Sequence, residues 1–223
     1  MATGTRPAKS SAKKTASKAT KAKATYSVHP AIAMVEKWID RLPETTGRSL
    51  DQWLAILKRD GPADPALRAA WLKKAHGFGT NEAHWIAGRG AGKGFADEDP
   101  DTYLDAAARY VDAMYAGPKA ALRPLHDRLL ALGRSMGEDV RVCPCKTIVP
   151  LYRNHVFAQV KPTTRTRIDF GLCLRGVKPA GRLISTGGEA KGDRITHRIA
   201  VESADDVDAT VARWLREAYE RDA

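Results

Sequence analysis

The feature that most constrains the fold is a segment in which apolar and polar residues alternate, RTRIDFGLCL at 165–174. Because successive side chains of a strand point to opposite faces of a sheet, this alternation predicts a strand with one buried face and one polar face. Ile168 and Phe170 would then enter the core, whereas Arg165 and Arg167 would project together from the other face.

Further strand-like runs surround this segment, at 139–143, 146–152, 156–161 and 194–201. The turns between them, such as "RNH" and "PTT", are short, which favours antiparallel hairpins. A helix is expected on each side of these runs. The first would begin at Pro118 and end at Gly133 or Gly137, and the second would begin at a cap formed by Ser203 and Asp206. A helix, an antiparallel sheet and a closing helix predict an α+β domain over residues 117–223, with one sheet face covered.

Residues 26–116 instead carry apolar residues three and four apart, which indicates helices. The first helix is expected to end at Pro43. The second is expected to begin at a capping box of Ser49 and Gln52 and to end at Gly61, and the third to begin at Asp64-Pro65 and to end at Gly77. Two further helices are expected to begin at Thr80 and at Asp99-Pro100. The tryptophans Trp38, Trp53, Trp71 and Trp85 lie on apolar faces and are expected to form the core. The sequence therefore predicts a small all-helical domain ahead of the α+β domain.

A glycine-rich segment within the helical part, GRGAGKG at 88–94, looks like a phosphate-binding loop. A Walker loop requires Ser or Thr after its Gly-Lys pair and a strand before its first glycine, but Gly94 follows Lys93 and a helix precedes the segment. We therefore interpret it as a flexible linker.

The first 25 residues hold seven basic residues and no acid. Subtracting these seven charges from the net charge of +11 leaves only +4 for the rest of the chain. The tail has few apolar residues beyond alanine, so it is predicted to be disordered. It could attract DNA or RNA non-specifically through counterion release, or serve only as a solubilising tail.

No membrane span or secretion signal is recognisable in the sequence, so a soluble, cytoplasmic protein without a membrane partner is expected. Within the cytoplasm, association with the nucleoid is one option. Its three cysteines are expected to be reduced. Cys143 and Cys145 lack a second closely spaced pair, so structural thiols are favoured over a metal site, and no cofactor is predicted. The oligomeric state is left open.

Two stretches resemble known families. LPETTGRSLDQWLAILK with AWLKKAHGFG resembles a short helical bacterial domain of unknown function. CKTIVPLYRNHVFAQVKPTTRTRIDFGLCL, with GRLISTGG and DRITHRI, resembles a second domain of unknown function that often follows the first. The second is also similar to a family labelled predicted transport proteins, some members of which carry a nuclease-like partner domain. The resemblance implies an α+β fold for the second half and brings no catalytic residue.

The candidate anion-binding side chains come from the predicted sheet and a glycine-rich loop at 176–193; they are Lys146, Lys161, Arg165, Arg167, Arg182, Arg194 and His197. A tight hairpin at "PTT" would place Lys161 close to Arg165 across the ladder. Guanidinium groups suit bidentate phosphate contacts, but the same alternation would produce a solvated strand face without any ligand. His197 has apolar neighbours at alternate positions and is expected to point toward the core or its rim.

No paired carboxylates or nucleophile with a base are recognisable, so a non-enzymatic protein is favoured. The first hypothesis is binding of nucleic acid or another polyanion through the basic tail and the basic sheet face. The alternatives are an enzyme or small-molecule binder that holds an anionic ligand under the 176–193 loop, and a protein–protein interaction module.

Overall fold

The computed structural model describes residue 1, residues 25–93 and residues 99–223. The predicted disordered tail therefore lies almost wholly outside the described residues, as does Gly94. The first half of the chain forms α1 (Pro30–Thr46), α2 (Leu50–Asp60), η1 (Pro65–Leu67), α3 (Arg68–His76), α4 (Thr80–Gly90) and α5 (Pro100–Met114). The second half forms η3 (Gly117–Leu122), α6 (Arg123–Arg134), β1 (Arg141–Val142), β2 (Val149–Tyr152), β3 (Val156–Pro162), β4 (Ile168–Leu172), β5 (Ile184–Ser185), η4 (Glu189–Lys191), β6 (His197–Val201), η5 (Ala204–Asp206) and α7 (Ala209–Glu220).

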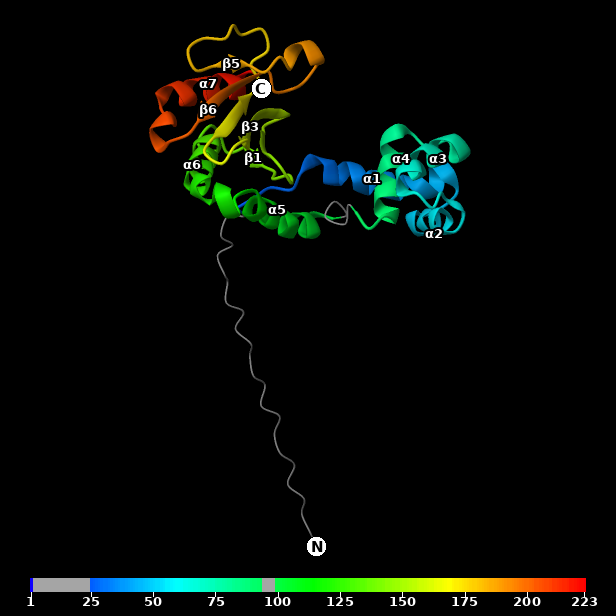
Figure 1. Ribbon diagram of the computed structural model, residues 1–223. Helices are drawn as coiled ribbons and strands as arrows, with labels where there is room; N and C mark the ends of the chain where they lie inside the picture. The colour runs from blue at the N-terminus through cyan, green and yellow to red at the C-terminus, as the bar shows by residue number, and fades with distance from the viewer. Residues whose placement is uncertain (2–24, 94–98) are drawn as a thin grey trace.

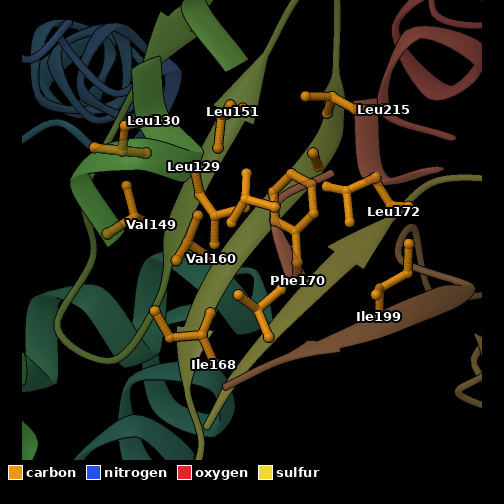
Figure 2. Close-up of a cluster of buried hydrophobic side chains, with 14 of the residues drawn as sticks. Leu129, Leu130, Val149, Leu151, Val160, Ile168, Phe170, Leu172, Ile199 and Leu215 are labelled. Atoms are coloured by element: carbon orange, nitrogen blue, oxygen red, sulfur yellow. The ribbon is translucent and has the colours of Figure 1, made fainter. Parts of the chain in front are cut away.

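The described strands form one antiparallel sheet in the order β1-β2-β3-β4-β6-β5, which confirms the predicted α+β fold with a helical N-terminal part. In the central ladder, Phe170 pairs with Val160 on β3 and with Ile199 on β6. These residues are fully buried together with apolar side chains of α6 and α7. Figure 2 shows members of this cluster pointing toward one another from the strands and helices. Phe170, on one alternating set of β4, therefore lies in the core, as the alternation predicted.

A separate core joins α2, α3 and α4 and contains Trp53, Leu57 and Leu72. Figure 1 shows these three helices gathered at one end of α1, with the sheet toward the other end. We call the residues around this core the helical unit, and those around the sheet core the α+β unit. The α+β core also includes Val111 and Met114 from the end of α5.

Helix α1 contributes to two different clusters along its length. Ile32, in its first turn, packs with Tyr103 and Ala107 of α5, whereas Leu42, near its end, belongs to the core of the helical unit. The segment just before α1 is tied to the sheet, because Ser27 N donates to Val142 O at 2.8 Å. A continuous helix thus connects the two units.

Local capping signals account for most helix boundaries. The Ser49–Gln52 capping box is present, with Ser49 N donating to Gln52 Oε1 at 2.9 Å, and Gly61 ends α2. Asp99 caps α5, where its Oδ1 accepts from Asp101 N and Thr102 N, each at 3.0 Å. Each of these contacts joins residues within three positions of each other, so the sequence alone predicts them.

The predicted helix stop at Pro43 is wrong. Pro43 lies inside α1, which continues to Thr46 and ends at Gly47 in the left-handed region (φ 73°). Proline cannot donate to the carbonyl four residues earlier, but its own carbonyl accepts from Gly47 N at 2.9 Å. The loss of one backbone hydrogen bond at Pro43 is tolerated because α1 ends three residues later, at Thr46.

The linker interpretation is wrong for residues 88–90, which form the end of α4. Arg89 is buried, at 8% exposure. A Cβ on Gly90 would lie 2.5 Å from Leu57 Cδ2, so a larger residue there would displace the Leu57 side chain packed between α4 and α2. The glycine at this position reflects packing rather than flexibility.

The expected ends of the helices that flank the sheet are also corrected. Helix α6 ends at Arg134, and Gly133 lies inside it, where an added Cβ would meet Leu151 Cδ2 at 2.1 Å. Ser203 and Asp206 cap η5, whereas α7 is capped by Asp208, which accepts from Thr210 N and Val211 N. The two-residue edge strand β5, in the glycine-rich loop, was not expected from the sequence.

Candidate functional site

The β3–β4 hairpin differs from the tight turn expected at "PTT". Strand β3 continues through Pro162, which pairs with Ile168, and residues 163–167 form the loop. Thr163 N and Thr164 N both donate to Arg167 O, at 3.1 and 3.3 Å. In this register Lys161 lies opposite Asp169, not Arg165. The prediction that Lys161 and Arg165 lie close across the ladder is therefore wrong. The turn was expected at residues 162–164, but Pro162 still belongs to β3 and the loop begins at Thr163.

Asp169 neutralises the polar face of β4. Its Oδ1 lies 3.0 Å from Arg167 Nε and 3.0 Å from Arg198 Nη1. Its Oδ2 accepts from the Thr163 hydroxyl at 2.8 Å. Arg167 therefore has a carboxylate partner within the protein, and Arg198, which sequence reasoning did not single out, shares that partner.

Arg182 and Arg194 are each paired with carboxylates away from the hairpin. Arg182 Nη1 lies 3.3 Å from Asp206 Oδ1, and Arg182 Nη2 lies 2.6 Å from Asp208 Oδ1. Arg194 pairs with the buried carboxylate of Asp222 and donates to Val156 O at 3.1 Å. These two arginines connect the sheet edge and loops to the start and end of α7.

His197 lies in the core rather than on a charged surface. It is 2% exposed, and its Nδ1 lies 2.9 Å from the Thr196 hydroxyl. That hydroxyl also accepts from Leu174 N at 3.0 Å. His197 is therefore a buried side chain of β6 and not part of an exposed charged surface.

The structure does bring together Lys146, Lys161 and Arg165. They line one groove of about 650 Å³ together with Lys119, which lies in η3. Lys119 Nζ donates to Pro162 O at 2.6 Å, which fixes it beside the hairpin. Within the described part of the chain, no ion pair involves Lys146, Lys161 or Arg165. None of the described residues that line the groove is acidic. We call this the basic groove.

Sequence reasoning missed Lys119 and Thr147, which also line the basic groove. Lys119 follows a Gly-Pro turn that carries no binding pattern, and its partner Pro162 is 43 positions away. Only the packing of the α5–α6 connection against the hairpin places it there. No local signal in the sequence could have identified it.

The 176–193 loop is tied to itself and to its neighbours. Arg175 Nη2 donates to Gly192 O and Asp193 O at 3.3 and 3.1 Å, and Gly176 N donates to Glu189 Oε1 at 3.1 Å. Arg165 lines a pocket with residues of the β3–β4 hairpin and η3, and Arg167, Arg182 and His197 are not among the residues that line that pocket.

Cys143 is a packed thiol. It is fully buried, and its Sγ donates to Val28 O at 3.6 Å, across the contact between the segment before α1 and the sheet. Burial raises the pKa of Cys143 to about 12, so the thiol is protonated at neutral pH. Within the described ranges, no three His, Cys, Asp or Glu side chains cluster as metal ligands would.

None of the helices in the described part of the chain has both the length and the apolar character needed to cross a membrane.

Comparison with known families finds two matches. The family described as Domain of unknown function (DUF4287) matches residues 35–88, and Domain of unknown function (DUF5655) matches residues 111–222. Curated proteins and solved structures gave no significant match. Two domains of unknown function in this order confirm the resemblance drawn from the sequence; the bacterial origin and the likeness to predicted transport proteins stay predictions. Because the second match covers half of the chain, the protein belongs to the family described as Domain of unknown function (DUF5655).

Proposed function

We propose that the protein binds nucleic acid through the basic groove. The observation that carries the proposal is the convergence of Lys119, Lys146, Lys161 and Arg165 on one groove whose described lining residues include no acid. Like charges gathered on one surface repel one another, and a bound polyanion would remove that repulsion. Phosphate backbones bind such cation groups through direct contacts and the release of counterions.

The basic tail would add non-specific attraction to the same partner. Its seven basic residues carry most of the net charge of the chain, so they would raise the rate of encounter and the salt dependence of binding. The role is non-enzymatic, and a cytoplasmic, nucleoid-associated location belongs to the same proposal.

Neutralising the groove is expected to weaken binding and reduce its salt dependence. For the Lys146→Gln, Lys161→Gln, Arg165→Gln triple variant, the slope of log K against log salt on duplex DNA should fall by about 2–3, since each phosphate contact contributes about 0.9. Fluorescence anisotropy of the full chain with a labelled duplex, between about 50 and 200 mM salt, measures this slope.

A matched control removes three charges elsewhere, with Lys58→Gln, Lys73→Gln and Lys74→Gln on exposed positions of α2 and α3. Equal weakening by both triple variants would show that only net charge matters and would rule out the groove. Absence of binding by the wild-type chain at low salt would refute the whole proposal. A third variant, with the seven basic tail residues changed to glutamine, separates the contribution of the tail.

Removing the acid beside the groove is expected to have the opposite effect on binding. Asp169→Asn leaves Arg167 and Arg198 without their carboxylate, so affinity for nucleic acid should rise several-fold and the salt slope should steepen by up to about 1. The free energy of unfolding should fall by about 1–2 kcal/mol, because charge-assisted hydrogen bonds are lost at a partly exposed site. Urea unfolding and anisotropy measure the two effects.

Asp51→Asn, on the exposed face of α2, makes the same change in net charge far from the groove. It should change neither quantity by more than the experimental error. Weaker binding by Asp169→Asn than by wild type would argue against a nucleic-acid contact at this hairpin.

A further inference from the structure

A second cavity, of about 570 Å³, adjoins the basic groove. Lys146 and Thr147 line both. The rest of its wall comes largely from α1, α4 and α5 and includes the rings of Trp38, Trp85 and Tyr110. We call it the aromatic cavity. A charged groove and an aromatic cavity therefore share one wall.

Trp38, one of the rings at this cavity, is not accounted for by core packing. The sequence predicted it in the core, but it is only half-buried and belongs to none of the buried clusters of the described residues. Trp53, by contrast, is 3% exposed at the centre of the helical unit. Met34, on the preceding turn of α1, also lines the cavity and is 45% exposed, so this side is accessible from solvent.

The aromatic cavity also offers hydrogen-bonding groups for a planar polar ring. His84 Nδ1 lies 2.8 Å from Thr80 O; because a carbonyl only accepts, Nδ1 donates this hydrogen bond and Nε2 is left for a further partner. Asn81 adds an amide, which both donates and accepts. Tyr103, which also lines the cavity, donates from its hydroxyl to Pro144 O at 2.9 Å. The described lining residues include no carboxylate that would repel a nearby phosphate.

We propose that the aromatic cavity and the basic groove together bind single-stranded nucleic acid. A base would stack against Trp38 in the cavity, and the adjoining phosphates would follow Lys146, Lys161 and Arg165 along the groove. This inference rests on the proposed function and specifies its substrate class. A positively charged groove with aromatic stacking platforms is the usual means of holding single strands. A duplex keeps its bases stacked and would have to extrude one to fill the cavity.

The test compares a single-stranded poly-dT oligonucleotide of about 12 nucleotides with a duplex of the same length, by anisotropy with the full chain. Wild type should bind the single strand more tightly at matched salt. Trp38→Ala should weaken single-strand binding about ten- to hundredfold, the loss expected for one stacked base, and leave duplex binding within about twofold. Trp38→Tyr should retain most of the affinity, because it keeps a stacking face. Circular dichroism confirms that both variants are folded.

Each remaining outcome overturns the inference in a distinguishable way. Equal binding of single strand and duplex, unchanged in Trp38→Ala, would overturn it while leaving groove binding intact. Absence of binding to either nucleic acid would overturn the proposed function as well. Competition by free dTMP as effective as by the oligonucleotide would assign the site to mononucleotides. A wild-type dimer in solution that becomes monomeric in Trp38→Ala would assign the cavity to a second copy of the chain.

Discussion

Replacing Phe170 with alanine is expected to lower the free energy of unfolding of the α+β unit by about 3–5 kcal/mol. The ring is 0% exposed and lies at the centre of the sheet, between strands β3 and β6 (Figure 2). Its removal loses the transfer free energy of the ring and leaves a cavity between the sheet and its covering helices. The surrounding side chains are held by their own packing and would fill that cavity only in part.

Native-state hydrogen exchange of the β3 and β4 amides measures this loss. The amides of α2 and α3, whose side chains form a different core, serve as the internal reference and should keep their protection. Leu67→Ala is the matched control, because Leu67 is 56% exposed and its truncation should cost less than about 0.5 kcal/mol. A change below about 1 kcal/mol for Phe170→Ala would contradict the packing described for the sheet.

Acidification from pH 7 to pH 4 is expected to remove about 3 kcal/mol of stability through His126 alone. His126 is 0% exposed on α6, with Nδ1 3.0 Å from the Tyr115 hydroxyl. Burial lowers the pKa of His126 from 6.5 to about 4. The unfolded chain therefore binds a proton between these two pH values that the folded chain does not. The contribution is fully present above pH 6.5 and is lost as the pH falls toward 4.

Urea unfolding of wild type and His126→Gln at neutral pH and near pH 4 tests this dependence. The variant lacks the titrating group, so its loss of stability on acidification should be smaller than that of wild type by about 2–3 kcal/mol. His84→Gln, which changes an exposed histidine, should follow wild type. Parallel acid dependence in wild type and His126→Gln would show that His126 is not protected from protons in the folded state.

Local patterns in the sequence predicted much of the fold, because the responsible contacts are short in sequence. The Ser49–Gln52 box and the Asp99 cap each join residues three apart. The alternation around Phe170 likewise follows from strand geometry alone. Pro43 and Gly133 were misread because their meaning depends on context: one sits near a helix end, and the other makes room for Leu151 on the sheet.

The candidate site was predicted less completely, because its partners are distant in sequence. One groove is lined by Lys146, Lys161 and Arg165, as the sequence suggested. Their relative positions, however, depend on the register of the β3–β4 hairpin and on where its turn lies. Arg182 and Arg194 looked available only because their carboxylate partners, such as Asp222, lie at the far end of the chain. The aromatic cavity draws on α1, α4, α5 and the segment before β2, and no single stretch of sequence contains its pattern.

The length of helix α1 limits which insertions and deletions this architecture can accept. Ten residues separate Ile32, packed beside α5, from Leu42, packed in the helical unit, which places the two contacts about 15 Å apart along the helix axis. One inserted residue between them would turn the helical unit by about 100° and move it about 1.5 Å. Trp38 lies within this interval, so such a change would also rotate one wall of the aromatic cavity away from the others. The length of α1 therefore fixes the rotation of the helical unit. Insertions or deletions that keep this rotation come in near-whole turns, and each such turn still moves the unit by about 5.4 Å along the helix axis.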